Sequence, residues 1–238
     1  MAERPAVMLV PGLLCDASIW APQRAALAAE YEVIIPDLWG LSSIPGMAEA
    51  VLAAAPARFS LAGHSMGARV AIEVIRRAPD RVERLALLDT GTHMQRPGEA
   101  EKRQELVDLA AREGMAALAA RWLPPMVHPD RANDAALMRP LTEMVCRATP
   151  AIFAGQVRAL LDRPDAAAVL PGVRCPTLIA CGRQDAWSPL IQHEEMAALI
   201  PGSELAVIEE SGHMSPVEAP AAVNGVLRAW LRMGSDAR

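Results

Sequence analysis

Short apolar runs alternate with longer helical segments at both ends of the chain. The runs predict strands buried on both faces, at residues 6–10, 32–36, 58–62, 82–88, 177–180 and 204–208. The segments between and after them predict helices at residues 17–29, 66–77, 189–200 and 218–232. Repeated strand–helix units indicate a doubly wound α/β sheet that is mostly parallel. Because such strands all end at one edge, we expect the chemistry in the loops that follow them.

The middle of the chain interrupts this alternation. It predicts four short helices, at residues 99–113, 115–122, 133–147 and 151–162. Pro140 lies inside the third of them, where we expect a break or a kink. We interpret residues 93–165 as a helical lid inserted into a core formed by residues 1–92 and 166–238.

Composition and charge exclude several classes of function. The 238 residues are 52% hydrophobic and carry a net charge of −5, which is typical of a globular protein and offers no basic surface for nucleic acid. Lys102 is the only lysine, which argues against Schiff-base and P-loop chemistry. No apolar run approaches the length of a membrane span, and the N-terminus shows no secretory pattern. We therefore expect a cytoplasmic protein.

The motifs of metal and cofactor sites are also missing from the sequence. The four cysteines lack CxxC spacing: Cys15, Cys146, Cys175 and Cys181. Neither an HExxH motif nor the glycine fingerprint of dinucleotide sites occurs. We expect a protein that needs no metal and no organic cofactor.

The segment GHSMG, residues 63–67, predicts a nucleophile elbow because it follows an apolar strand and opens a helix. The tight turn of an elbow requires small residues two positions before and after the nucleophile, which Gly63 and Gly67 provide. The helix N-terminus below the turn favours developing negative charge. We therefore predict that Ser65 is the nucleophile. Cys15 is a weaker alternative, since no elbow surrounds it.

A serine nucleophile needs a base and an acid that orients the base. Asp185 and His213 each follow a predicted strand, so both are expected at the same sheet edge as Ser65. We predict His213 as the base and Asp185 as the acid. Asp89, which also ends a strand, is the alternative acid.

The surroundings of this triad can be predicted more coarsely. We expect the backbone N–H groups of Leu13 and Met66 to form the oxyanion hole. Large apolar side chains in adjoining loops and in the lid are the candidates for the substrate pocket: Trp39, Trp122, Met126, Trp187 and Met214.

The other polar residues near the predicted site receive mostly structural interpretations. We expect His64 to make a structural hydrogen bond, and His93 to be either a pocket residue or a surface residue. His128 and His193 are expected to be solvated. Arg121 is either a surface charge or a contact for an anionic substrate.

Six segments spread over nearly the whole chain carry a family resemblance: VPGLLCD, PDLWG, LAGHSMGA, ERLALLDT, CPTLIACGRQDAWSP and EESGHMSPVEAP. Together they resemble the α/β-hydrolase superfamily, and within it small serine carboxylesterases with a short helical lid, such as pimeloyl carrier-protein methyl ester esterases. The sequence departs from the common pattern where Pro11 replaces a histidine and Ala68 replaces a glycine.

The resemblance implies hydrolysis of a small to medium carboxylic ester through an acyl-serine. From the apolar pocket candidates we expect an uncharged ester as the small-molecule partner. Three other enzymes would use the same triad: a C–C bond hydrolase, a lactonase and a thioesterase. A ligand-binding receptor of the same fold is the non-enzymatic alternative.

Overall fold

The computed structural model describes residues 4–234, which form one sheet of six parallel strands in the order β2-β1-β3-β4-β5-β6. The strands are β1 (Ala6–Val10), β2 (Glu32–Ile34), β3 (Phe59–His64), β4 (Val82–Leu88), β5 (Thr177–Gly182) and β6 (Glu204–Ile208). Every residue of β1, β3 and β5 is buried, as the continuous apolar runs predict. The predicted doubly wound parallel sheet is confirmed.

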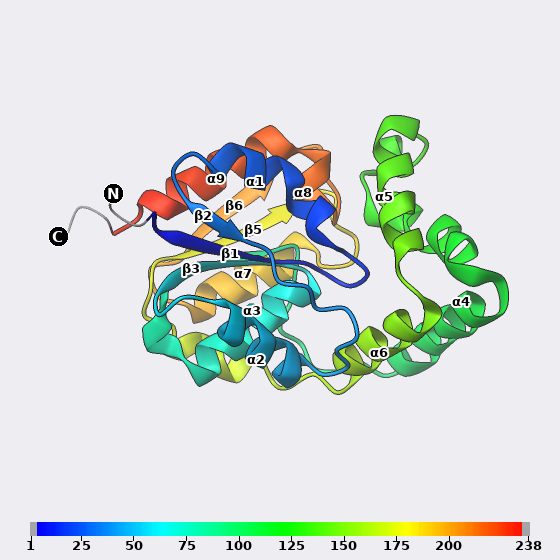
Figure 1. The fold of residues 1–238 in the computed structure, drawn as a ribbon, viewed down its shortest axis with the longest axis horizontal. Helices are drawn as coiled ribbons and strands as arrows, with labels where there is room; N and C mark the ends of the chain where they lie inside the picture. Colours follow the sequence, from blue (N-terminus) through cyan, green and yellow to red (C-terminus); the bar gives the residue numbers. More distant parts are fainter. Residues whose placement is uncertain (1–3, 235–238) are drawn as a thin grey trace.

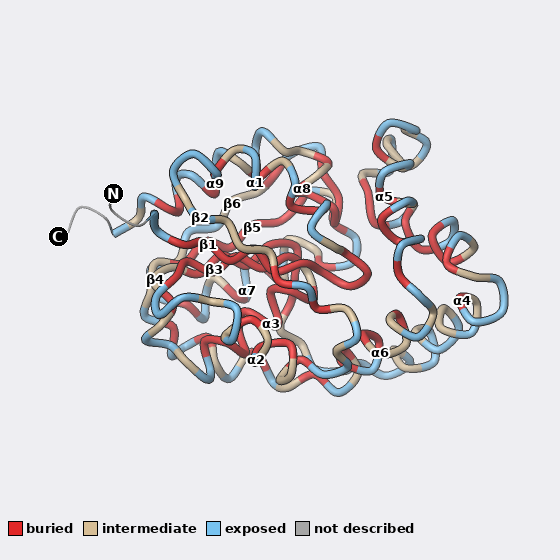
Figure 2. The backbone as a smooth tube through the Cα atoms, in the orientation of Figure 1, coloured by how far each residue is buried: buried red, intermediate tan, exposed pale blue. Residues whose placement is uncertain are grey.

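Helices cover both faces of the sheet (Figure 1). One face is covered by α1 (Ala21–Leu27), α8 (Ser215–Glu218) and α9 (Pro220–Arg232), and the other by α2 (Ile44–Ala54), α3 (Met66–Arg77) and α7 (Leu190–Leu199). The buried residues concentrate along the strands and the inward helix faces (Figure 2). The remaining short elements are 3-10 helices: η1 (Ala17–Trp20), η2 (Pro79–Arg81), η3 (Pro124–Met126), η4 (Pro129–Arg131) and η5 (Ala167–Gly172).

The α2 helix is absent from the sequence-based prediction. Ser43 caps it by accepting a hydrogen bond from Gly46 N at 3.1 Å, and a proline occupies the first turn. A serine cap followed by proline is a typical helix start, so the signal was present in the sequence.

Three further helices lie beside the carboxyl ends of the strands: α4 (Glu99–Trp122), α5 (Ala135–Arg147) and α6 (Pro150–Leu161) (Figure 1). Gly114 interrupts α4 with φ 83° and ψ 174°, between the two helices that the sequence predicts there. Of the break or kink predicted at Pro140, the break is wrong, because α5 continues through this residue. Asp134 caps α5, and the four buried residues of this helix anchor it against its neighbours: Leu137, Leu141, Met144 and Val145.

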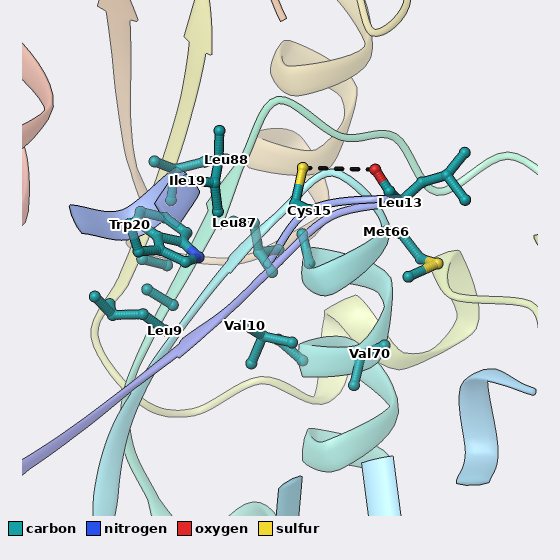
Figure 3. Close-up of a cluster of buried hydrophobic side chains, with 14 of the residues drawn as sticks. Leu9, Val10, Leu13, Cys15, Ile19, Trp20, Met66, Val70, Leu87 and Leu88 are labelled. Carbon is teal, nitrogen blue, oxygen red and sulfur yellow. Dashed lines mark hydrogen bonds between the residues drawn. The ribbon is translucent and has the colours of Figure 1, made fainter. Parts of the chain in front are cut away.

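Buried side chains from several elements meet below the carboxyl end of the sheet (Figure 3). Leu9 and Val10 of β1 and Leu87 and Leu88 of β4 pack in the same cluster as Met66 and Val70 of α3. This apolar base supports the loops in which the functional residues are predicted. Within residues 4–234, no helix combines the length and apolarity that crossing a membrane requires.

The backbone at Gly114 suggests a test of stability with an internal control. Gly114→Ala should lower the free energy of unfolding by about 1–3 kcal/mol, because its φ and ψ belong to a region that only glycine adopts readily. Gly225→Ala should instead raise it by about 0.5–1 kcal/mol, because Gly225 is exposed in the middle of α9 and its Cβ would meet nothing. Urea denaturation of both variants measures the two values, and equal signs would contradict this account.

Candidate active site

Ser65 occupies a strained turn between β3 and α3, with φ 55° and ψ −116°. Its N–H donates to Leu88 O at 2.9 Å. A Cβ at Gly63 would lie 2.3 Å from Gly67 O, and a Cβ at Gly67 would lie 2.2 Å from Val10 O. Both positions therefore require glycine, because the first turn of α3 lies almost against the strands. This packing places Ser65 at the carboxyl edge of the sheet.

His213 lies between Ser65 and Asp185 in a continuous chain of side-chain contacts. Its Nε2 is 2.8 Å from Ser65 Oγ, and its Nδ1 is 2.7 Å from Asp185 Oδ2. The other Asp185 oxygen, Oδ1, accepts hydrogen bonds from the backbone N–H groups of Trp187 and Ser188, both at 2.8 Å. The structure thus brings together three residues that the sequence places in separate loops.

The charges of Asp185 and of a protonated His213 stabilise each other. Burial opposes protonation of His213, but the Asp185 carboxylate outweighs it and raises the pKa of the imidazole above its usual value. Burial likewise opposes ionisation of Asp185, yet His213 and the two backbone donors lower the pKa of the carboxyl group. A neutral His213 can accept a proton from Ser65 Oγ, and the imidazolium that forms is held by Asp185.

Asp89, the alternative acid, has other partners. Its Oδ1 accepts from Gly182 N at 2.9 Å, its Oδ2 accepts from Ser215 Oγ, and His64 Nε2 lies 3.6 Å away. Burial, followed by the charge of Asp185, raises the pKa of Asp89. These contacts tie β4 to β5 and to the loop of His213, while Asp185 is the carboxylate that pairs with His213 Nδ1.

The remaining histidines differ in burial and partners. His64 Nε2 donates to His213 O at 2.7 Å, and burial lowers the pKa of His64 to about 3. His193 was expected in solvent but is fully buried: its Nε2 accepts from Thr90 N at 3.0 Å. It points inward because α7 packs against β5, a tertiary contact with no local signature. His93 lines the cavity described below, and His128 is partly exposed.

The backbone N–H groups of Leu13 and Met66 belong to residues that line the same cavity as Ser65. Within the described part of the chain, neither group donates a hydrogen bond. A side chain of α6 binds the loop that contains Leu13: Gln156 Oε1 accepts a hydrogen bond from Leu14 N at 2.8 Å. Leu14 itself adopts a positive φ of 58°. No local pattern indicates Gln156, because its partner lies 142 residues away in the sequence.

A cavity opens above Ser65. The predicted pocket residues Trp122, Met126, Trp187 and Met214 line it, but Trp39 does not. Trp39 Nε1 donates to Cys15 O at 3.3 Å, and its ring lines a separate hollow beside Asp16. The Trp39 backbone N–H donates to Asp37 Oδ1 at 2.9 Å.

Cys15, the alternative nucleophile, lines the cavity as a buried thiol. Its Sγ donates to Leu13 O at 3.5 Å (Figure 3). Burial, followed by the charge of Asp16, raises the pKa of the thiol to about 12. The thiolate that nucleophilic attack requires is therefore disfavoured.

One wall of the cavity is charged, in contrast to the apolar pocket that the sequence predicts. It contains Arg69, Arg103, Arg163 and Glu99. Arg69 could have been found, because it follows Ser65 by four residues on a predicted helix and therefore shares its face. Arg121, the arginine that the sequence analysis considered, is 64% exposed and does not line the cavity.

The loop of His213 is bound to the segment between α4 and α5. His213 N donates to Met126 O at 2.7 Å. Buried Glu218 accepts hydrogen bonds from Gly212 N and Met214 N, both at 3.0 Å, and from His128 N at 2.7 Å. One carboxylate thus fixes the backbone on both sides of His213.

The chain is similar to known hydrolases in sequence and in fold. The chain is 27% identical over 245 residues to the protein named "Putative carbamate hydrolase RutD" of Escherichia coli, with 95% of this chain and 91% of the relative covered. A thermophilic esterase from Thermogutta terrifontis, solved with malate bound, superimposes with a TM-score of 0.89 at 31% identity, over 98% of this chain and 91% of that one. An enol-lactonase from Burkholderia xenovorans LB400 superimposes with a TM-score of 0.87 at 25% identity, over 97% and 92% of the two chains.

The family profile described as "Alpha/beta hydrolase family" matches residues 7–226, nearly the whole chain. The parallel sheet with helices on both faces is the fold of this family. The chain therefore belongs to the alpha/beta hydrolase family and is a hydrolase.

Proposed function

We propose that this protein is a serine hydrolase that cleaves small to medium carboxylic esters through an acyl-serine intermediate. The observation that carries the proposal is the contact chain from Asp185 through His213 to Ser65, with distances of 2.7 and 2.8 Å. A nucleophile, its base and an orienting acid are thereby in reach of one another at the floor of a cavity.

The reaction follows from this arrangement. His213 Nε2 takes the proton of Ser65 Oγ as the oxygen attacks the ester carbonyl carbon, and the tetrahedral oxyanion accepts hydrogen bonds from Leu13 N–H and Met66 N–H. The bond to the alcohol oxygen then breaks, and His213 protonates that oxygen. Water attacks the acyl-serine with the same proton transfers, which releases the carboxylic acid and restores Ser65.

The relatives support attack on an acyl carbon, because their names describe an esterase, an enol-lactonase and a carbamate hydrolase. We propose ester cleavage first, since the structural relative with the highest identity of these three is the esterase. We also propose that residues 93–165 act as a lid, because Trp122, Met126 and Leu160 from this segment line the cavity. Release of acid and alcohol from a simple ester distinguishes this enzyme from a receptor.

The first test removes the nucleophile. Ser65→Ala should abolish labelling by a fluorophosphonate and lower ester hydrolysis by several orders of magnitude, because the three residues act as a unit. Ser203→Ala is the matched control, since Ser203 lies at the amino end of β6, on the opposite sheet edge. Near-normal hydrolysis by folded Ser65→Ala protein would refute the proposal.

The second test is the pH dependence. The base works only when neutral, and its pKa is raised, so kcat/KM should rise with pH through a midpoint above the usual histidine value of 6.5. Asp185→Asn should move this midpoint down and lower kcat by about 10⁴, as replacement of the orienting aspartate does in a serine protease. If Asp185→Asn were silent and Asp89→Asn inactive, Asp89 would be the acid.

The third test concerns the oxyanion loop. Gln156→Leu removes the acceptor of Leu14 N, so it should lower kcat by about 10- to 100-fold, less than the 10²–10³ caused by losing an oxyanion donor outright. Gln156→Glu keeps an acceptor oxygen and should restore most of kcat. The measurement is kcat and KM for one ester, and equal activity of the two variants would exclude a positioning role for Gln156.

A further inference from the structure

The charged wall of the cavity starts one helical turn below the candidate nucleophile. Ser65 is the N-cap of α3 and Arg69 follows four residues later, so the two backbones are separated by about 6 Å along the helix axis. Both residues line the same cavity. A substrate whose carbonyl carbon lies at Ser65 Oγ therefore needs only a short further part to reach Arg69.

The guanidinium of Arg69 is buried without a full set of partners. The residue is 8% exposed, and its Nη2 donates to His93 O at 3.2 Å. Within residues 4–234, its Nη1 has no hydrogen-bond partner, and no carboxylate lies within ion-pair distance of this side chain. Burial, followed by the charge of Arg163, lowers the pKa of Arg69 to about 9, which still leaves it charged at neutral pH.

Two acidic side chains, one on α4 and one on α3 itself, are already paired with other arginines. Glu99 of α4 accepts from Arg163 through both oxygens, at 2.8 and 2.7 Å, and from Arg103 Nε at 2.9 Å. Glu73, one turn beyond Arg69 on α3, forms salt bridges with two exposed arginines, Arg76 at 2.9 Å and Arg77 at 2.8 Å. The cavity wall thus holds three guanidinium groups against one carboxylate, a net charge of +2.

A second orphaned polar atom lies on the same wall. His93 Nδ1 is buried and has no hydrogen-bond partner in the described chain. Burial, followed by the charge of Arg69, lowers the pKa of His93 to about 4, so the ring is neutral and carries one N–H. Arg69 and His93 both line the cavity, and each carries a buried nitrogen without a hydrogen-bond partner in the described residues.

We propose that Arg69 binds a free carboxylate of the substrate, so that the esters or lactones this enzyme hydrolyses carry a second, ionised carboxyl group. An unpaired buried charge is costly, and the planar fork of a guanidinium matches the geometry of a carboxylate. The carboxylate takes no part in bond breaking: it orients the acyl carbon over Ser65. This inference rests on the proposed function and replaces the expectation of an uncharged ester, which considered the apolar residues alone.

The test uses substrate pairs that differ only in charge. Monoethyl glutarate and ethyl glutaramate place a carboxylate or an amide in the acyl part, and both release ethanol. The butyrate esters of 3-hydroxypropanoate and 3-hydroxypropanamide place the same groups in the alcohol part, and both release butyrate. The wild-type enzyme should prefer the carboxylate by about 10- to 100-fold in kcat/KM in one of the two pairs, which identifies the part that faces Arg69.

Variants then assign the preference to one side chain. Arg69→Met should lower kcat/KM for the preferred carboxylate by at least about tenfold more than for its amide, because only the carboxylate loses a charge-assisted hydrogen bond. Arg69→Lys keeps a positive charge without the planar fork and should retain part of the preference. Arg121→Met removes an exposed arginine of α4 and should leave the preference unchanged.

Binding to Ser65→Ala separates this inference from the proposed function. Calorimetry should show that this variant binds monoethyl glutarate or butyryloxypropanoate more tightly than the amide, and that Arg69→Met in the same background removes the difference. Arg69-dependent binding without turnover by the wild type would overturn the proposed function alone. Turnover of both members of each pair at equal kcat/KM, or equal losses in Arg69→Met, would overturn the carboxylate site alone. If Arg69→Met fails to fold, the wild-type comparison and Arg69→Lys still decide.

Discussion

The close contact between the first turn of α3 and strands β1 and β3 is the constraint on which the site depends. It leaves no room for a Cβ at Gly63 or Gly67, and it holds Ser65 at φ 55°. The same contact determines where the Met66 N–H points and which face of α3 enters the cavity. Arg69, one turn further along, reaches the cavity for this reason. A single packing contact between backbones therefore aligns the candidate nucleophile, one candidate oxyanion donor and the charged wall.

Buried side chains hold the loops around this turn. Glu218 and Gln156 each accept backbone N–H groups from a loop of the site, and Asp89 accepts one from the last residue of β5. None of these contacts is one of the backbone hydrogen bonds between strands. The sheet therefore determines where the loops lie, and the buried acceptors determine their conformations. Burial raises the pKa of Asp89 and of Glu218, which shows that these acceptors are maintained at an electrostatic cost.

The core and the helical segment 93–165 contribute different chemistry to the cavity. The core provides Ser65, His213 and Arg69. The helical segment provides apolar side chains together with the charged wall residues Glu99, Arg103 and Arg163. Glu99 compensates two arginines of the wall but leaves Arg69 unpaired. We therefore propose that the core and the helical segment together determine substrate selectivity, since neither forms the cavity alone.

The sequence by itself determined the parallel sheet, the elbow at Ser65 and the residues that the structure brings to it, Asp185 and His213. These depend on local patterns, namely apolar runs and turn glycines, and on the rule that parallel strands end at one edge. Tertiary structure decided four other features. They are the placement of the Trp39 side chain, the burial of His193, the acceptor role of Gln156 and the pairing of Glu99 with Arg163. Each of them depends on contacts between segments 24 to 142 residues apart, such as Trp39 with Cys15 and Gln156 with Leu14. A one-dimensional pattern states which face of an element is buried, but the partner on that face is chosen only when the elements pack.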